Sequence, residues 1–178
     1  MRQGEGKGSM ARKDKVQKTN AMRELDRAGI SYTVHVYEVD ESDLSGVHVA
    51  EQLGEEPGQG FKTLVTVSPA GEHVVCCIPV AEELDLKAAA RVAGQKALSM
   101  MHVRDLLPTT GYVRGGCSPV GMKKRFPTLV DETAELWDTV YISGGRRGLQ
   151  LELAPADLVR FCDATLADIC SSGGDATA

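Results

Sequence analysis

The sequence predicts a single α/β domain of the mixed (α+β) type, built on a mixed, largely antiparallel sheet flanked by helices. Its length of 178 residues suits one domain of ordinary size. Short β-branched segments alternate with helical patterns, and a Pro-Ala-Gly-Glu turn at 69–72 joins two of those segments as a hairpin. No segment recurs with a fixed period, so an array of βαβ units is not expected.

Composition excludes several classes of function. The chain carries a net charge of −5 and only 4% aromatic residues. A protein that binds nucleic acid over a wide surface needs a broad basic field or many aromatic stacking partners. Neither is available in the body of this chain. The exception is the N-terminal segment 1–18, which contains six Lys and Arg residues and only two acidic residues.

Targeting and metal-binding signals are absent from the sequence. Residues 1–30 hold no continuous apolar stretch, so we expect no signal peptide. No run approaches the ~18 apolar residues of a membrane helix, and no membrane partner is expected. The five cysteines form no C-x-x-C pair and no zinc-type cluster with histidine. These features predict a reduced cytoplasmic protein without a metal ion or other cofactor.

The order of elements follows from local patterns. Residues 1–12 are predicted to be a disordered arm, 13–170 the domain and 171–178 a frayed tail. Helices are expected over 14–28, 47–53, 84–93, 103–107 and 155–162. Gly29, Gly54 and Gly94 stop the first three helices. Strands are expected over 31–39, 61–68, 73–80, 97–101, 129–130, 139–143 and 148–153. Segment 165–170 reads as a strand or a helix remnant. A long loop from 108 to about 127 is of the kind that usually carries function.

Three glycine-rich stretches at the ends of predicted strands are the candidates for chemistry. They span 58–62, 114–121 and 143–148, and each carries a cation, with Lys62 in the first. Glycine lets backbone N–H groups approach a ligand closely, which is how a backbone holds a phosphate or a developing oxyanion. Tight turns with solvated charges are the alternative for any one of them.

Two side chains in these stretches have two readings each. Lys62 shares a strand face with Leu64, and is either partly buried in a pocket or an edge lysine whose ammonium reaches solvent. Cys117 is either structural or a nucleophile, and a nucleophile requires a nearby base, usually His. All four histidines lie elsewhere in the sequence. No P-loop, G-x-G-x-x-G, G-x-S-x-G or H-E-x-x-H motif occurs.

The motifs together carry a family resemblance. Phe-Lys-Thr-Leu-Val at 61–65, Leu-Asp-Leu-Lys at 84–87, Gly-Tyr-Val-Arg-Gly-Gly-Cys-Ser-Pro-Val-Gly at 111–121 and Ser-Gly-Gly-Arg-Arg-Gly-Leu at 143–149 occur in this order, with Lys123 and Lys124 after the third. In this combination the chain resembles the YbaK/EbsC family of freestanding aminoacyl-tRNA deacylases, related to the editing domain of bacterial prolyl-tRNA synthetase. The resemblance spans about residues 15–170.

The resemblance implies hydrolysis of mischarged Cys-tRNA(Pro). A pocket built for proline rejects a side chain of similar size poorly, so errors need a second site. The implied mechanism is substrate-assisted: the thiol of the misattached cysteine attacks its own carbonyl, and Lys62 positions or stabilises the ester. The implied partners are the 3′ end of aminoacyl-tRNA and, in a transient complex, prolyl-tRNA synthetase. The implied substrate-binding residues are Tyr37, Thr63, Gly115, Gly116, Ser143, Gly144 and Gly145.

One position departs from the family pattern. Some members hold Asp shortly after the third glycine-rich stretch, where this chain has Gln150. Glutamine keeps hydrogen bonding but loses the charge, so Gln150 is expected to bind substrate and not to act as a base. The alternatives are a deacylase of different acyl specificity, a non-catalytic module that binds tRNA or prolyl-tRNA synthetase, and a thiol-dependent hydrolase that uses Cys117.

Overall fold

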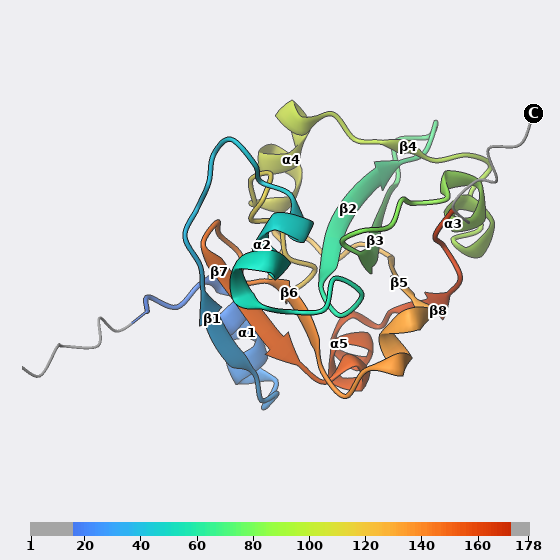
Figure 1. The fold of residues 1–178 in the computed structure, drawn as a ribbon. Coiled ribbons are helices and arrows are strands. Elements are labelled where there is room, and N and C mark those ends of the chain that lie inside the picture. The colour runs from blue at the N-terminus through green and yellow to red at the C-terminus, as the bar shows by residue number, and fades with distance from the viewer. Residues whose placement is uncertain (1–15, 172–178) are drawn as a thin grey trace, which may run out of the picture.

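Two sheets organise residues 16–171, the part of the chain that this computed structural model describes (Figure 1). The first sheet is antiparallel, with the order β1-β7-β6: β1 (Thr33–Val36), β7 (Leu149–Leu153) and β6 (Val140–Ser143). The second has the order β4-β2-β3-β5-β8: β4 (Ser99–Met100), β2 (Phe61–Val67), β3 (His73–Pro79), β5 (Thr128–Asp131) and β8 (Thr165–Ala167). Its β4-β2-β3 part is antiparallel and its β3-β5-β8 part is parallel. The predicted fold class is confirmed, with two sheets instead of one.

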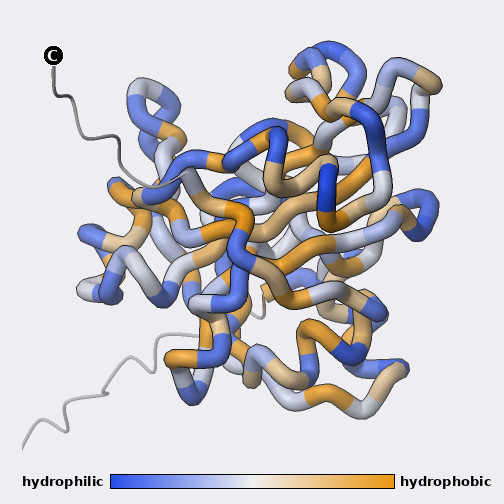
Figure 2. Tube along the Cα trace, turned by 90° about the vertical axis from the view of Figure 1, so that its right-hand side faces the viewer, coloured by the Kyte–Doolittle hydropathy of each residue, from blue (hydrophilic) through white to orange (hydrophobic). Residues whose placement is uncertain are grey.

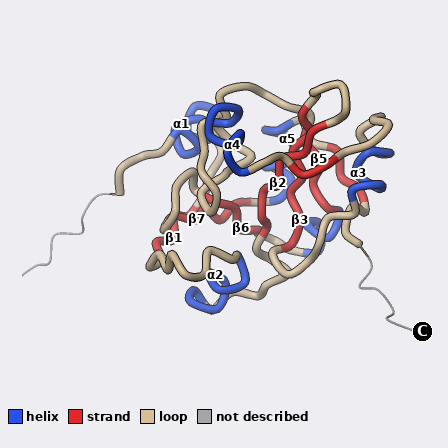
Figure 3. Tube along the Cα trace, turned by 90° about the horizontal axis from the view of Figure 1, so that it is seen from above, coloured by secondary structure: helices blue, strands red, loops and turns tan. Residues whose placement is uncertain are grey.

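Helices cover both faces of the three-stranded sheet. Figures 1 and 3 place α1 (Asn20–Arg27) and α2 (Gly46–Leu53) on opposite sides of it. The other helices are α3 (Leu86–Val92) beside β3, α4 (Val103–Thr110), α5 (Pro155–Cys162) and the short 3-10 helix η1 (Glu132–Leu136). None of the helices in the described residues is long and apolar enough to cross a membrane.

The core has two parts, one on each face of β3. Val75 and Cys77 belong to a large cluster that includes Leu25 of α1 and Leu151 of β7. Their neighbours Val74, Cys76 and Ile78 pack in a second cluster with Ala89 and Ala90 of α3. Side chains alternate along a strand, so Cys76 and Cys77 point to opposite faces. Figure 2 shows apolar segments crossing the middle of the molecule and hydrophilic turns at its periphery.

Strand β2 has one open edge, and this positions the site. It pairs with β3 along its whole length but with β4 only at Thr66 and Val67. Beside this edge a single bridge between Gly60 and Tyr141 connects the two sheets, where Tyr141 N–H donates to the Gln59 carbonyl at 3.0 Å. Among residues 16–171, no strand pairs with this edge of β2 over 61–64, so the edge can face a ligand.

The first helix is shorter than predicted. It begins at Asn20 and not at residue 14, because Thr19 is its N-cap. The Thr19 hydroxyl accepts from the Met22 N–H at 3.3 Å and donates to the Gly144 carbonyl at 2.6 Å, which holds residue 19 in extended geometry. Of the predicted helix, residues 14–15 lie outside the described part of the chain.

The helix α4 is longer than predicted. It continues through Pro108 to Thr110, where the sequence indicated a loop. Proline removes one N–H from the helix, but the Thr110 hydroxyl donates to the Leu106 carbonyl at 2.8 Å and the Gly111 N–H to the Leu107 carbonyl at 2.9 Å. These two bonds complete the last turn, and the irregular segment begins only at Gly111.

The predicted N-terminal arm and C-terminal tail lie largely outside the described residues. The arm at 1–12 lies wholly outside, and of the predicted tail at 171–178 only Ser171 is described. Its N–H donates to the Glu83 carbonyl at 2.9 Å. Within segment 165–170, Thr165–Ala167 form the strand β8, and Cys170 forms an isolated bridge with Leu84.

Candidate functional site

A cavity of about 440 Å³ lies along the open edge of β2, within the size range of small-ligand sites. It is lined from several separate segments: β2, the start of α2, residues 100–106, the irregular segment near Gly115, and β6 with β7. All three glycine-rich stretches reach it, through Lys62, Gly115 and Ser143. The fold thus brings together motifs that lie far apart in the sequence.

The edge of β2 supplies Lys62 and Thr63. Neighbouring side chains of a strand point to opposite faces of a sheet. Lys62 and Thr63 can both line this cavity because it lies along the edge of β2. The Val65 carbonyl accepts from the Met101 N–H at 3.1 Å on this side. Backbone groups alternate in direction along a strand, so the Thr63 N–H and carbonyl point to this side too.

Lys62 is half-buried in the cavity wall. Within residues 16–171, no carboxylate forms an ion pair with its ammonium. The geometry therefore favours a lysine placed in a pocket over an edge lysine that reaches solvent. A cation without a counter-ion in such a wall is suited to a negatively charged or strongly polar ligand atom.

The N-terminus of α2 lines the same cavity as Lys62. The Ser45 hydroxyl caps it by accepting from the His48 N–H at 3.3 Å. A Cβ at Gly46 would lie 2.3 Å from Val80 Cγ1, so glycine is what lets the helix start this close to the end of β3. The start of a helix carries partial positive charge, which adds to that of Lys62.

Two glycine-rich stretches pack against each other where Gly115 lines the cavity. Arg147 Nε donates to the Arg114 carbonyl at 2.9 Å. A Cβ at Gly116 would lie 2.9 Å from Arg146 Cα, so the two backbones nearly touch. Gly115, which lines the cavity, has a left-handed backbone with φ +82° that favours glycine.

The turn between β6 and β7 brings Ser143 into the cavity wall. The Ser143 hydroxyl accepts from the Gly145 N–H at 3.2 Å, and the Gly144 N–H donates to the Leu149 carbonyl at 2.8 Å. A Cβ at Gly144 would meet Leu149 Cγ at 2.7 Å. Gly144 and Gly145 therefore build the turn that holds Ser143.

The predicted site residues divide into two groups. One group lines the cavity: Tyr37, Lys62, Thr63, Gly115, Ser143 and Gln150. The other, Gly116, Gly144 and Gly145, lies in the packed turns just described, and a direct contact of these three with substrate stays a prediction. Sequence reasoning missed the start of α2 and the apolar wall formed by Met100, Met101, Val103 and Leu106. The available signal for α2 was Ser45, an N-cap residue just before a helical pattern.

Cys117 also lines the cavity but is poorly suited to act as a nucleophile. Its side chain is buried, and burial raises its pKa to about 12. The reactive form of cysteine is the thiolate, and a pKa this high keeps the thiol protonated at neutral pH. The arrangement therefore favours the structural reading of Cys117.

A row of polar side chains crosses the three-stranded sheet on the side of the cavity. Gln150 of β7 pairs with His35 of β1 and Ser143 of β6. His35 Nε2 lies 2.7 Å from Glu152 Oε2, and the Thr139 hydroxyl donates to Glu152 Oε1 at 2.7 Å. The bonds from Thr139 and His35 hold the pKa of Glu152 below its usual range. In the described residues, no three His, Cys, Asp or Glu side chains gather as a metal site.

Comparison with known proteins identifies the family. The family model of the aminoacyl-tRNA editing domain matches residues 45–161. A protein of Enterococcus faecalis named "Putative Cys-tRNA(Pro)/Cys-tRNA(Cys) deacylase EbsC" is 46% identical over 160 residues, which cover 90% of this chain and 98% of that protein.

Two solved structures share the fold. One, described as "a putative trans-editing enzyme for prolyl tRNA synthetase", is 25% identical with a TM-score of 0.74, and the match covers 86% of this chain and 96% of that one. The hypothetical protein APE2540 is 24% identical with a TM-score of 0.79, over 86% of this chain and 100% of its own. The family match and the close relative together show that the chain belongs to the aminoacyl-tRNA editing domain family.

Proposed function

We propose that the protein is a trans-editing aminoacyl-tRNA deacylase that removes cysteine from Cys-tRNA(Pro). The observation that carries this proposal is Lys62, a half-buried cation beside the unpaired edge of β2 in a cavity of about 440 Å³. The name of the relative that is 46% identical supports the choice of substrate.

The chemistry needs no nucleophile from the protein. The thiol sulfur of the misattached cysteine bonds to its own ester carbonyl carbon. The bond from that carbon to the ribose oxygen breaks, and the thiol proton passes to that oxygen. The products are free tRNA and a cyclic thioester of cysteine. This route fits a cavity in which the one lining cysteine, Cys117, has a pKa raised to about 12 by burial.

Lys62 is expected to stabilise the reacting ester. As sulfur attacks, negative charge develops on the carbonyl oxygen, and a cation placed near that oxygen lowers the barrier. The Thr63 N–H on the same edge and the start of α2 are further donors on this wall. Gly115 and Ser143 also line the cavity, and we expect them to leave room for the terminal ribose to approach the backbone.

Selectivity follows from the same chemistry. Proline has no side-chain nucleophile and a serine hydroxyl is a much weaker nucleophile than a thiol, so either ester is spared even when it enters the cavity. Discrimination by size alone supplies only about 1–3 kcal/mol per methylene. The reactivity of the substrate thiol thus provides the difference in cleavage rate that differences in binding cannot provide.

Prolyl-tRNA synthetase is the proposed partner that delivers the tRNA. The chain carries a net charge of −5, which is unfavourable for independent binding to a phosphate backbone. A cavity for the 3′ end alone can work when another protein holds the rest of the tRNA. Cytoplasmic location is proposed on the same ground, since charged tRNA is used there.

A single-turnover assay with three esters tests the function. The protein is incubated with Cys-tRNA(Pro), Ala-tRNA(Pro) and Pro-tRNA(Pro), with and without the synthetase, and the remaining ester is measured. We expect only the cysteine ester to be lost, faster with the synthetase present. Equal loss of alanine would favour a deacylase of broader acyl specificity. If no ester is lost faster than in buffer, the protein is not a deacylase, and the non-catalytic binding module is the remaining alternative.

A further inference from the structure

Gln150 places an unsatisfied acceptor at the cavity. The residue lines the cavity and is only 9% exposed, and its Oε1 has no hydrogen-bond partner in the described part of the chain. A buried amide oxygen that lacks a donor costs free energy. Such an atom at the wall of a substrate cavity is suited to a donor that the ligand brings.

Glu55 adds two further acceptors behind Gln150. It directly follows Gly54, the left-handed C-cap of α2, and its N–H donates to the Ala50 carbonyl at 2.9 Å. Both carboxylate oxygens are buried, and neither has a hydrogen-bond partner within residues 16–171. Burial raises the pKa of Glu55, while the nearby Gln150 amide and His35 lower it and Glu152 raises it. The chain thus keeps a carboxyl group with two buried oxygens that lack a hydrogen-bond partner next to the amide that lines the cavity.

The two side chains are arranged to act together. An amide has donors on its nitrogen and acceptor sites on its oxygen. When the Gln150 NH₂ turns toward Glu55, its oxygen is left for the cavity. A carboxylate behind the amide polarises it, and hydrogen bonds in such a series strengthen one another.

We propose that Glu55 and Gln150 recognise the α-ammonium group of the aminoacyl ester, with Gln150 Oε1 as the direct acceptor and Glu55 as the positioning residue that supplies the charge. This inference rests on the proposed function. It assigns Glu55 to substrate selection, as a residue that acts through Gln150.

Charge favours an ammonium group over a neutral hydroxyl at this place. A buried carboxylate is costly unless a cation compensates it, and hydrogen bonds from a charged donor are about twice as strong as neutral ones. Lys62 stands on β2 and Gln150 on β7 of the other sheet, and both line the same cavity. The substrate ammonium is therefore drawn toward Gln150, and its neighbouring ester carbonyl toward Lys62.

The experiment compares two esters that differ only in the ammonium group. Single-turnover rates are measured for Cys-tRNA(Pro) and for tRNA(Pro) charged with 3-mercaptopropionate, which keeps the thiol and the ring size of the product but lacks the amine. Wild type is expected to cleave the cysteine ester at least tenfold faster. Glu55→Gln is expected to lose most of that preference, by slowing the cysteine ester and not the other. Glu56→Gln, an exposed neighbour, should behave as wild type.

A second variant guards against a folding defect. Gln150→Leu removes the acceptor oxygen at similar size and should also level the two rates. Equal cleavage of both esters by wild type, or an equal loss on both in Glu55→Gln and Gln150→Leu, would overturn the inference while leaving the deacylase function intact. Cleavage of neither ester by wild type would contradict the proposed function and this inference with it.

Discussion

Arg147 Nε donates a hydrogen bond to the main-chain carbonyl of Arg114 at 2.9 Å. This bond ties the turn between β6 and β7 to the irregular segment that follows α4. Gly115, the next residue, lines the cavity with a backbone φ of +82°. One wall of the site is therefore held by contacts between two loops. A side chain added where their backbones meet should disturb this wall.

Gly116→Ala is predicted to separate these loops. The new Cβ would lie 2.9–3.0 Å from backbone atoms of Arg146 and Arg147, so the backbone must move, at a typical cost of about 1–3 kcal/mol. Thermal unfolding should show the lost stability, and deacylation should fall at least tenfold. Gly60→Ala is the matched control for stability, because its Cβ would meet Val80 only at ordinary distances of 3.6–3.7 Å. Equal unfolding temperatures for Gly116→Ala and wild type would show that the wall tolerates the side chain.

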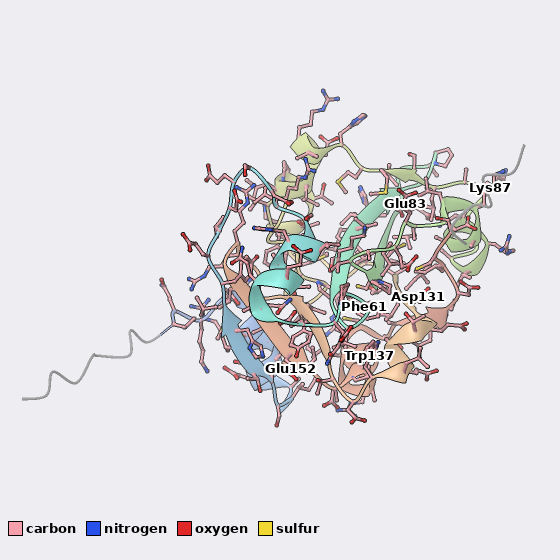
Figure 4. All side chains as sticks on the ribbon, viewed as in Figure 1. Phe61, Glu83, Lys87, Asp131, Trp137 and Glu152 are labelled. Atoms are coloured by element: carbon pink, nitrogen blue, oxygen red, sulfur yellow. The ribbon has the colours of Figure 1, made fainter. Side chains whose placement is uncertain are left out.

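Asp131 is predicted to stabilise the junction of β5, η1 and β8 (Figure 4). Its buried carboxylate accepts from the Thr133 N–H at 3.1 Å, the Thr133 hydroxyl at 2.6 Å and the Ile169 N–H at 3.1 Å. Burial alone would raise the pKa of Asp131, but these bonds lower it overall. Asp131→Asn places an NH₂ group against a donor and should cost about 2 kcal/mol in urea unfolding at pH 7.

The pH dependence of this effect has a definite sign. A carboxyl whose folded-state pKa is lowered adds stability above its unfolded pKa, here 3.8, and loses it as the pH falls through the folded value. The difference in unfolding free energy between wild type and Asp131→Asn should therefore disappear as the pH is lowered. The exposed Asp138→Asn serves as the control. If the difference in unfolding free energy stays the same in acid, the charge of the carboxylate is not its source.

Much of the fold was predictable because local signals and burial agree. The hairpin of β2 and β3, α2 with Gly54 at its end, and α5 with Pro155 at its first turn all match their sequence patterns. The errors arose where tertiary contacts decide. Thr19 caps α1 because the distant Gly144 carbonyl binds its hydroxyl, and no local pattern contains that information. The two sheets likewise meet at the isolated bridge of Gly60 with Tyr141, a contact between distant residues.

The site was predictable where glycine motifs mark it and not where the wall is apolar. Lys62, Gly115 and Ser143 were indicated by their motifs, and the structure brings them to one cavity. Met100 and Val103 line it only because β4 pairs with the end of β2. Glu55 follows a helix C-cap, where an acidic residue usually faces solvent, so its burial against Gln150 could not be inferred from the sequence.

Glu55→Gln is predicted to stabilise the protein at neutral pH even as it impairs substrate selection. Burial, the main cause, raises the pKa of Glu55 above its usual value of 4.5, so ionisation at higher pH destabilises the folded state. Removing the charge should therefore raise the unfolding temperature at pH 8. The gain should shrink toward pH 4.5. Glu56→Gln should show no such gain, and a Glu55→Gln variant less stable than wild type at pH 8 would refute this account of the carboxyl.

Cys117 is predicted to react slowly with alkylating agents in the folded protein. With its pKa raised to about 12 by burial, it forms roughly a hundredfold or more less thiolate at pH 8 than an ordinary thiol. Labelling with iodoacetamide, followed by mass spectrometry, should be slow in buffer and fast in urea. Rapid labelling of folded protein that also stops deacylation would favour the thiol-dependent hydrolase instead.

The most direct measurement of the central claim is the single-turnover rate for Cys-tRNA(Pro) in Lys62→Ala beside Lys87→Ala. Lys87 is exposed on α3, well away from Phe61, the neighbour of Lys62 (Figure 4), so its loss changes the net charge equally without touching the cavity. Removal of one group that stabilises a developing oxyanion typically costs about 10²–10³ in rate. We predict a loss of that size for Lys62→Ala and a rate near wild type for Lys87→Ala. Equal rates for both variants and wild type would contradict a catalytic role for Lys62.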